Sequence, residues 1–220
     1  MAVVELRQYT LHPGRRDALI DLFEREFVES QEAVGMTLIG QFRDLDDPDR
    51  FVWLRGFPDM KARRRSLEAF YFGPVWQAHR EAANATMIDS DDVLLLKPLD
   101  GAHGFVLGER GSRGASAPGA GRIVGGIHAL NGPDDPLPER FRHLAAPALR
   151  RAGAASVAAL VTEAGPNTFP RLPVREGEQV LVWLSVFAEP VAADAARDAF
   201  PEGSLQRLRL EPTARSRLHG

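Results

Sequence analysis

The sequence predicts an α+β fold made of two successive halves, each with the element order β-α-β-β-α-β. Three observations lead to this prediction. Segments with strand and helix periodicity follow one another in that order up to Leu99. A segment rich in Gly, Ser and Pro, without periodicity, runs from Asp100 to Gly121. The same order then returns more loosely in the rest of the chain, which indicates an internal repeat.

Periodicity and turn residues place the elements of the first half. A strand over Val3–Leu11 is closed by Pro13-Gly14, and a long helix from Arg15 to Val34 is ended by Gly35. A hairpin is then expected over residues 36–43 and 50–57. Two helices, over 58–71 and 74–83, are divided by Gly73-Pro74, and a last strand follows over 91–99. This is the order of the ferredoxin-like fold.

The second half repeats this order with weaker signals. A strand is expected over residues 122–130 and a helix over 137–153. A hairpin with a longer tip follows over 155–163 and 178–190, then a short helix over 192–200 and a last strand over 204–212. The clearest internal match is FVWLRGF (residues 51–57) against LVWLSVF (residues 181–187). The predicted organisation is therefore a domain over 1–99, a linker over 100–121 and a diverged second domain over 122–220.

Composition excludes several classes of function. The formal net charge is -3 and the chain contains no cysteine, so no nucleic-acid partner, disulfide or thiolate nucleophile is predicted. The run Arg63-Arg64-Arg65 is expected on the solvated side of a helix, and a phosphate or carboxylate site is the alternative. With no apolar run of about 20 residues and no signal peptide, we expect a cytoplasmic protein without a membrane partner. The preference for Arg over Lys is typical of a GC-rich bacterial genome.

Alternation along the strands suggests a ligand cavity. We expect Val4, Leu6, Val52 and Leu54 to face the helices, because they are aliphatic. The opposite face then carries Glu5, Arg7, Tyr9, Phe51, Trp53, Arg55 and Phe57. Two such sheets facing each other would make a barrel whose interior is lined by aromatic and Arg side chains, which suits a ligand cavity. In the alternative interpretation, Glu5 and Arg7 merely pair at the rim.

The first half resembles a known family. The segments ELRQYTLHPGRRDALIDLFEREF, GQFRDLDDPDRFVWLRGF and FYFGPVWQAHREAANATMIDSDDVLLLKP together resemble the NIPSNAP family over residues 3–98. The resemblance implies the dimeric α-β barrel superfamily, in which ferredoxin-like units associate through their sheet faces. That association can be a homodimer or an intramolecular pseudo-dimer. The second half resembles the family only in architecture, and the resemblance implies no particular reaction.

His79 is the first candidate for catalysis. It lies on the predicted helix after Pro74, where it could act as a general base, or could simply pack and bond to a carbonyl. Asp91 could hold the imidazole in one tautomer if the last strand starts beside this helix. Trp76 could wall a pocket, or stack with Arg80. Asn84 could cap the helix end or turn inward as a ligand contact.

His128 is the second candidate, because it aligns with Tyr9 when YTL is matched to HAL in the two opening strands. It could be titratable in the cavity or purely structural, and haem binding through His79 or His128 is a further alternative. No metal site or cofactor is predicted, since no metal-binding or nucleotide-binding motif occurs.

The sequence therefore predicts a protein that binds an apolar or aromatic metabolite. The predicted contacts are Arg7, Tyr9, Trp53, Arg55, Trp76 and Asn84, with an Arg engaging an oxygen or carboxylate. Catalysis, if present, would be cofactor-free oxidation, isomerisation or proton transfer involving His79, His128 and Asp91. The alternative is a non-catalytic binding or interaction module with a packed barrel interior.

Overall fold

The computed structural model describes residues 1–196, 200 and 203–220. The first half contains β1 (Val3–Leu11), α1 (Arg16–Leu22), the π-helix η1 (Phe23–Phe27), α2 (Val28–Glu32), β2 (Thr37–Asp44), β3 (Arg50–Phe57), α3 (Met60–Tyr71), α4 (Pro74–Asn84) and β4 (Met87–Pro98). Asp59 caps α3 by accepting a hydrogen bond from the Ala62 amide, and Pro74 opens α4 as expected.

The second half repeats these elements with shorter helices. It contains β5 (Arg122–Ala129), α5 (Leu137–Arg140), the π-helix η2 (Phe141–Ala145), α6 (Ala146–Arg151), β6 (Ala154–Thr162), β7 (Val180–Phe187), α7 (Pro190–Ala196) and β8 (Ser204–Pro212). The helix predicted over 192–200 is observed as α7, and part of its predicted range lies outside the described residues. A π-helical turn interrupts the first long helix of both halves, which adds to the evidence for a repeat.

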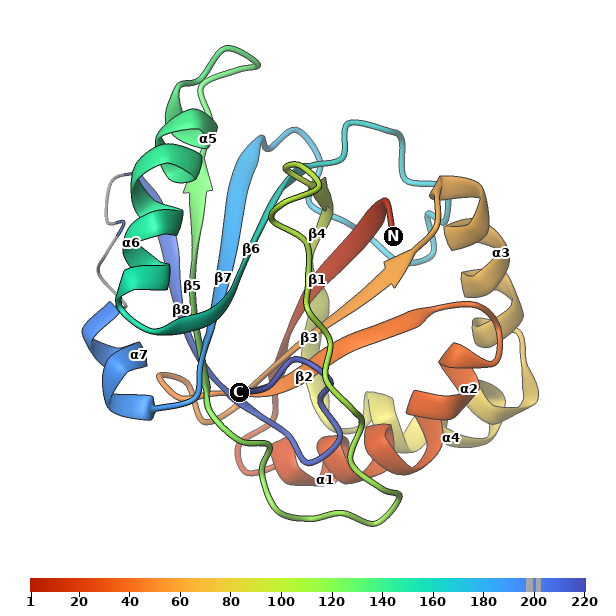
Figure 1. The fold of residues 1–220 in the computed structure, drawn as a ribbon. Helices are drawn as coiled ribbons and strands as arrows, with labels where there is room; N and C mark the ends of the chain where they lie inside the picture. Colours follow the sequence, from red (N-terminus) through yellow and green to blue (C-terminus); the bar gives the residue numbers. More distant parts are fainter. Residues whose placement is uncertain (197–199, 201–202) are drawn as a thin grey trace.

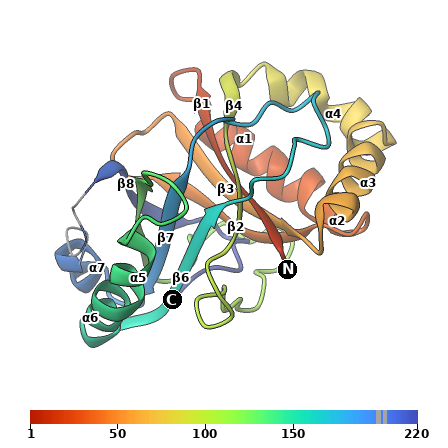
Figure 2. The same ribbon diagram turned by 90° about the horizontal axis from the view of Figure 1, so that it is seen from above.

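The strands form a closed barrel in the order β1-β3-β2-β8-β5-β7-β6-β4, with helices outside it (Figures 1 and 2). Each half supplies four neighbouring antiparallel strands in ferredoxin-like order, so the predicted α+β fold is confirmed. Short antiparallel ladders join the halves, Phe42–Asp44 with Leu210–Pro212 and Leu96–Pro98 with Leu160–Thr162. The barrel thus closes within one chain, without a second copy.

The barrel interior is a packing core. It is filled mainly by aliphatic side chains from strands of both halves, including Val4, Leu6, Ile39, Phe42, Val52, Leu54, Ile123, Val182, Leu184 and Leu210. Leu218 near the C-terminus packs into the same cluster, as do Phe105 and Leu107 from the segment that connects the halves. The interior of an eight-stranded barrel is just wide enough for such side chains to fill it.

The expected direction of the strand faces was wrong. Val4, Leu6, Val52 and Leu54 point into the barrel, whereas Glu5, Arg7, Tyr9, Trp53 and Arg55 lie outside it, buried under the helices of the first half. The physical reason is room: the narrow interior takes compact aliphatic groups, while the space under α1–α4 accepts large aromatic and guanidinium groups. The expected aromatic and arginine lining of the barrel interior is therefore corrected: the described interior is packed with mainly aliphatic side chains.

None of the helices in the described part of the chain is both long and apolar enough to cross a membrane.

Candidate functional site

A buried ionic cluster lies between the outer face of β1 and β3 and the helices of the first half. At its centre is Glu5, whose carboxylate accepts from Arg7 Nη1 at 2.8 Å, Arg55 Nε at 2.8 Å and Arg63 Nε at 2.6 Å. Glu5, Arg55 and Arg63 have no exposed surface, and Arg7 is 1% exposed. Gln31 of α2 completes the cluster by accepting from Arg55 Nη1 at 2.9 Å.

The cluster carries an excess of positive charge. Three guanidinium groups surround one carboxylate, which leaves two positive charges without a buried anion among the described residues. Burial by itself raises the pKa of Glu5, but Arg55, Arg7 and Arg63 outweigh it and hold the pKa well below its usual range. Buried charge without a counter-charge is costly, so this cluster favours the approach of an anion.

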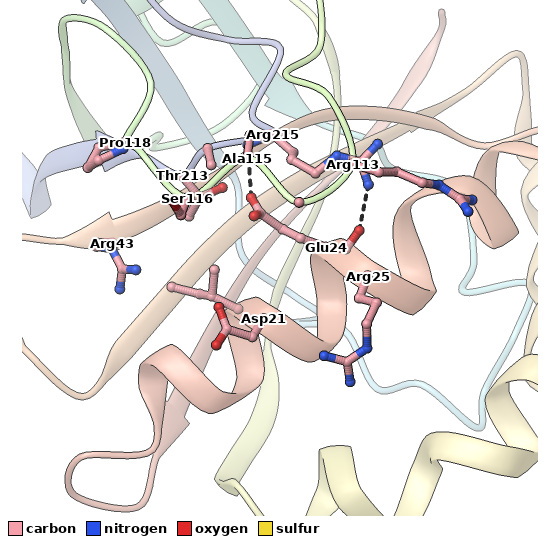
Figure 3. A pocket seen from close by; sticks show the side chains of 13 residues that line it. Asp21, Glu24, Arg25, Arg43, Arg113, Ala115, Ser116, Pro118, Thr213 and Arg215 are labelled. Atoms are coloured by element: carbon pink, nitrogen blue, oxygen red, sulfur yellow. Dashed lines mark hydrogen bonds between the residues drawn. The ribbon is translucent and has the colours of Figure 1, made fainter.

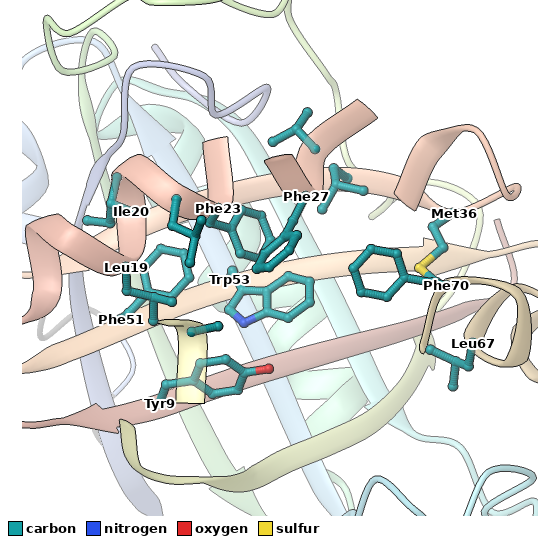
Figure 4. Close-up of a cluster of buried hydrophobic side chains, with 14 of the residues drawn as sticks. Tyr9, Leu19, Ile20, Phe23, Phe27, Met36, Phe51, Trp53, Leu67 and Phe70 are labelled. Carbon is teal, nitrogen blue, oxygen red and sulfur yellow. The ribbon is translucent and has the colours of Figure 1, made fainter. Parts of the chain in front are cut away.

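Aromatic side chains form a small cavity beside the cluster. Its walls are Tyr9, Leu19, Phe23, Phe27, Gln31, Trp53, Phe70, Tyr71, Trp76, Ala83 and Met87, all buried or half-buried. Figure 4 labels six of these residues, Tyr9, Leu19, Phe23, Phe27, Trp53 and Phe70. The cavity volume is about 30 Å³, which is room for about two water molecules. The guanidinium carbons of Arg7 and Arg55 lie 5.5 and 5.0 Å from the Trp53 ring centroid. The Trp53 ring therefore contacts both the cavity and the ionic cluster.

Two polar groups of this wall, on Trp53 and Tyr9, can donate a hydrogen bond to a ligand. Trp53 Nε1 is buried and lacks a hydrogen-bond partner among the described residues. The Tyr9 hydroxyl accepts from Arg7 Nε at 3.0 Å, which leaves its own proton for another acceptor. Burial raises the pKa of Tyr9, so the hydroxyl stays protonated. Gln31, in contrast, uses its amide oxygen for Arg55 and its amide nitrogen for the Phe27 carbonyl.

Helix α4 covers the cavity loosely. Ala83 is the one buried residue of this helix, all of which the structure describes. Trp76 is half-buried and packs on Phe27 and Tyr71 with ring centroids 5.5 and 4.9 Å apart. Asn84, the last residue of α4, is exposed and does not line the cavity in the described structure. Of the predicted contacts, α4 thus brings Trp76 to the cavity.

His79 and Asp91 are not brought together. His79 lies on α4 with its Nε2 3.5 Å from Glu26 Oε2 and its ring edge toward Phe27. Asp91 is exposed on β4, where its amide donates to Asp89. The acid beside His79 is therefore Glu26, which the sequence did not indicate. Neither His79 nor Asp91 is among the described residues that line the aromatic cavity.

His128 lies in the equivalent position of the second half. The strand register matches it to Tyr9 and matches Trp183 to Trp53. His128 has no exposed surface, and its Nε2 accepts from Trp183 Nε1 at 2.9 Å. Because that nitrogen is already engaged, it is not available to haem iron. Gly126 gives this pair its space, since a Cβ there would lie 2.6 Å from His128 Nε2.

The ionic cluster is confined to the first half. By the same register, Val124, Gly126 and Ser185 stand where the first half has Glu5, Arg7 and Arg55. These substitutions leave no charged group at the three positions. Among the described residues, this ionic cluster is therefore present at Glu5 in the first half and is not repeated at the equivalent positions of the second half.

Sequence reasoning missed Arg63 and Gln31. The run Arg63–Arg65 was expected to be solvated, but Arg63 is buried while Arg64 and Arg65 are exposed. Helical spacing carried the signal, because Arg63, Leu67 and Phe70 lie on one face of α3 and the last two are apolar. Gln31 lies one turn after Phe27 and could have been found by the same spacing.

A second cavity, of about 350 Å³, lies on the other side of η1, between residues 113–118 and the C-terminal segment (Figure 3). Its arginines are already paired with nearby acids, for example Arg25 with Glu26 at 2.8 Å and Arg113 with Glu29 at 3.3 Å. Glu24 accepts from the Arg215 amide at 3.0 Å. Because these acidic and basic side chains pair with one another, this cavity does not favour a ligand of one charge, unlike the Glu5 cluster.

No group of three or more acidic, His or Cys side chains suited to a metal ion occurs in the part of the chain that the structure describes.

The Glu5 cluster should make stability depend on pH. Because the folded-state pKa of Glu5 is lowered from 4.5, its contribution is complete above about pH 4.5 and is lost as the pH falls. We expect the free energy of unfolding, measured with urea between pH 7 and pH 3, to decline below about pH 4.5. The Glu5→Gln variant should show a shallower decline, and equal slopes would contradict this assignment.

The fold and the site together define a class: a single-chain α+β barrel whose first half holds an aromatic cavity beside a cluster of buried arginines. Residues 4–102 match the NIPSNAP family model, which is the similarity that the sequence motifs had indicated. A NIPSNAP-like domain protein from Burkholderia xenovorans is 27% identical, covers 47% of this chain and 90% of its own, and has a TM-score of 0.43. No curated protein matches the chain.

Two solved structures match nearly the whole chain. A candidate monooxygenase from Fusobacterium nucleatum has a TM-score of 0.59 at 8% identity, over 96% of this chain and 91% of its own. A candidate monooxygenase from Lactobacillus acidophilus has a TM-score of 0.56 at 14% identity, over 97% and 94% of the two chains. At these identities the likeness establishes the shared two-half barrel fold and nothing about the reaction.

Proposed function

We propose that this protein binds a small molecule with an aromatic or apolar body and an anionic oxygen group, in the cavity between β1, β3 and the first-half helices. The observation that carries the proposal is that two groups of the cavity wall, Trp53 Nε1 and the Tyr9 hydroxyl, each have a proton that they donate to no described residue. Such a wall leaves donors unpaired until a ligand supplies acceptor oxygens. The aromatic rings around them supply contact for an apolar body.

The ionic cluster supports the negative charge of the ligand. Arg7 donates to the Tyr9 hydroxyl and thereby polarises it, so a ligand oxygen that accepts from Tyr9 is stabilised indirectly by Arg7. Arg55 packs its guanidinium group against the rings of Trp53 and Tyr71, two residues of the cavity wall. A carboxylate or phenolate would reduce the excess charge of the cluster, whereas a neutral ligand would not.

Entry of a ring requires helix α4 to move. The cavity as it stands has room for about two water molecules, which is less than one aromatic ring needs. Trp76 on α4 packs against the cavity wall, and the rest of that helix is mostly exposed. An outward shift of α4 about Gly73 would enlarge the cavity without disturbing the strands.

Binding, without a reaction step, is the extent of this proposal. Among the described residues that line the cavity there is no histidine, so proton transfer by His79 or His128 would require a ligand bound elsewhere. Oxidation or isomerisation of a bound metabolite would instead depend on the reactivity of the ligand itself.

Binding of an aromatic acid tests the proposal. Isothermal titration calorimetry with benzoate and with its neutral counterpart benzamide should give at least tenfold tighter binding of the acid. The Trp53→Phe variant keeps the ring but removes the donor, so benzoate affinity should fall by about tenfold. Trp183→Phe is the matched control, because it changes a buried Trp at the equivalent position of the other half and should leave the affinity unchanged.

Equal affinity for benzoate and benzamide would contradict the anionic class of ligand. Equal effects of Trp53→Phe and Trp183→Phe would contradict the location of the site. Both variants should be checked for folding by circular dichroism, because each changes a buried side chain.

A further inference from the structure

One loop differs strongly in length between the two halves. In the first half, β2 and β3 are joined by residues 45–49, whereas in the second half β6 and β7 are joined by residues 163–179. The longer connection contains no helix or strand. Loops of this length without secondary structure are uncommon and usually have a function.

This β6–β7 loop lies over the helices of the other half. Both views show it, in cyan, running from the second-half strands to α3 (Figures 1 and 2). Asn167 Oδ1 and Thr168 Oγ1 accept from Arg63 Nη1 at 3.0 and 3.2 Å. Thr168 in turn donates to the Met60 carbonyl at 3.3 Å. The loop therefore holds the one arginine of the ionic cluster that comes from a helix.

Phe169, in the same loop, supports the aromatic cavity from behind. It is 5% exposed, and its ring stacks on Tyr71 with centroids 5.9 Å apart and planes at 24°. Tyr71 lines the cavity, while Phe169 does not touch it. Phe169 thus acts on the cavity through Tyr71, whose ring it keeps from moving away.

We propose that the β6–β7 loop of the second half is a positioning element of the first-half ligand site, and that Phe169, through Tyr71, limits the size of the ligand. This inference rests on the proposed function of that site. The second half has no charged cluster of its own, because Val124, Gly126 and Ser185 stand at the positions equivalent to the charged residues of the first half. By this proposal the second half instead contributes to the ligand site of the first half. One half supplies the binding residues and the other supplies the support that fixes them.

The experiment compares two ligand sizes. Affinities for benzoate and 2-naphthoate are measured by calorimetry for the wild type and for Phe169→Ala. Without the phenyl ring, Tyr71 can move into the vacated space, so the preference should shift toward 2-naphthoate by about tenfold. Phe169→Tyr should restore the preference of the wild type, because it restores the stacked ring.

Arg171→Ala is the control within the same loop. Arg171 lies over the ring of Phe72, which is exposed and outside the cavity, so this variant should keep the ligand preference of the wild type. Thermal unfolding of each variant identifies any general loss of stability. Such a loss would lower the affinities for benzoate and 2-naphthoate equally and leave the ratio of the two affinities unchanged.

The outcomes separate the two proposals. If the wild type binds an aromatic acid and Phe169→Ala leaves the ratio of the two affinities unchanged, the role of the loop is overturned and the site stands. If the wild type binds neither acid, both proposals are overturned. A shifted ratio that Phe169→Tyr restores supports the loop as the positioning element.

Discussion

Replacing Glu5 by Gln is expected to lower the free energy of unfolding by about 3–5 kcal/mol, as for other buried pairs that lose one partner. The carboxylate is the common partner of Arg7, Arg55 and Arg63, all of them buried. A neutral amide of the same size keeps the packing but leaves three guanidinium groups without an anion. Urea unfolding monitored by circular dichroism measures the effect.

Glu68→Gln is the matched control for this change. The Glu68 side chain is 41% exposed and pairs with exposed Arg64 at 2.9 Å, so its loss should cost less than about 1 kcal/mol. If Glu5→Gln fails to fold, the double variant Glu5→Gln, Arg63→Met should recover folding, because it removes one of the uncompensated charges. A cost for Glu5→Gln no larger than for Glu68→Gln would show that the cluster is not the buried ionic centre described above.

Truncating Phe42 to Ala is expected to lower the free energy of unfolding by about 3–5 kcal/mol. Phe42 has no exposed surface and packs in the barrel interior with aliphatic groups such as Ile39 and Leu54. It also lies on β2 where that strand pairs with β8 and closes the barrel. The rigid strands around it cannot collapse into the cavity left behind, so the full cost should appear in urea unfolding.

Leu205→Ala is the control, because Leu205 lies on β8 but is 58% exposed. Its expected cost is below about 0.5 kcal/mol. If Phe42→Ala were tolerated equally well, the interior would be an adaptable cavity and not a packed core.

Much of the fold could be read from the sequence because its signals are local. The strand over Arg50–Phe57 was placed with the observed ends, and Pro74 marked the start of α4. Alternation, helical spacing and turn residues act over a few positions, so they remain visible without knowledge of the tertiary structure. The π-helical turns were not predicted, since nothing in their residues distinguishes them from α-helix.

Only some of the site residues predicted from the sequence lie close together in the structure. Arg7, Tyr9, Trp53 and Arg55 do lie together, because they share one face of two paired strands. Asp91 and Asn84 do not join them, because both are exposed, and half-buried His79 packs on Phe27 without lining the cavity. Helical spacing could have indicated that Arg63 is buried, but not that it pairs with Glu5. No local pattern could have placed Phe169 of the β6–β7 loop against Tyr71.

The sequence by itself determined the elements, their order, the repeat and the relationship of the first half to a family. Only the tertiary structure decided which strand face is inside, because both faces of β1 and β3 are buried and alternation alone cannot tell a barrel interior from a helix-covered surface. It also decided that the barrel closes within one chain, through pairs such as Phe42 with Pro212. Such pairs depend on contacts between distant segments, and these form only when the whole chain has folded.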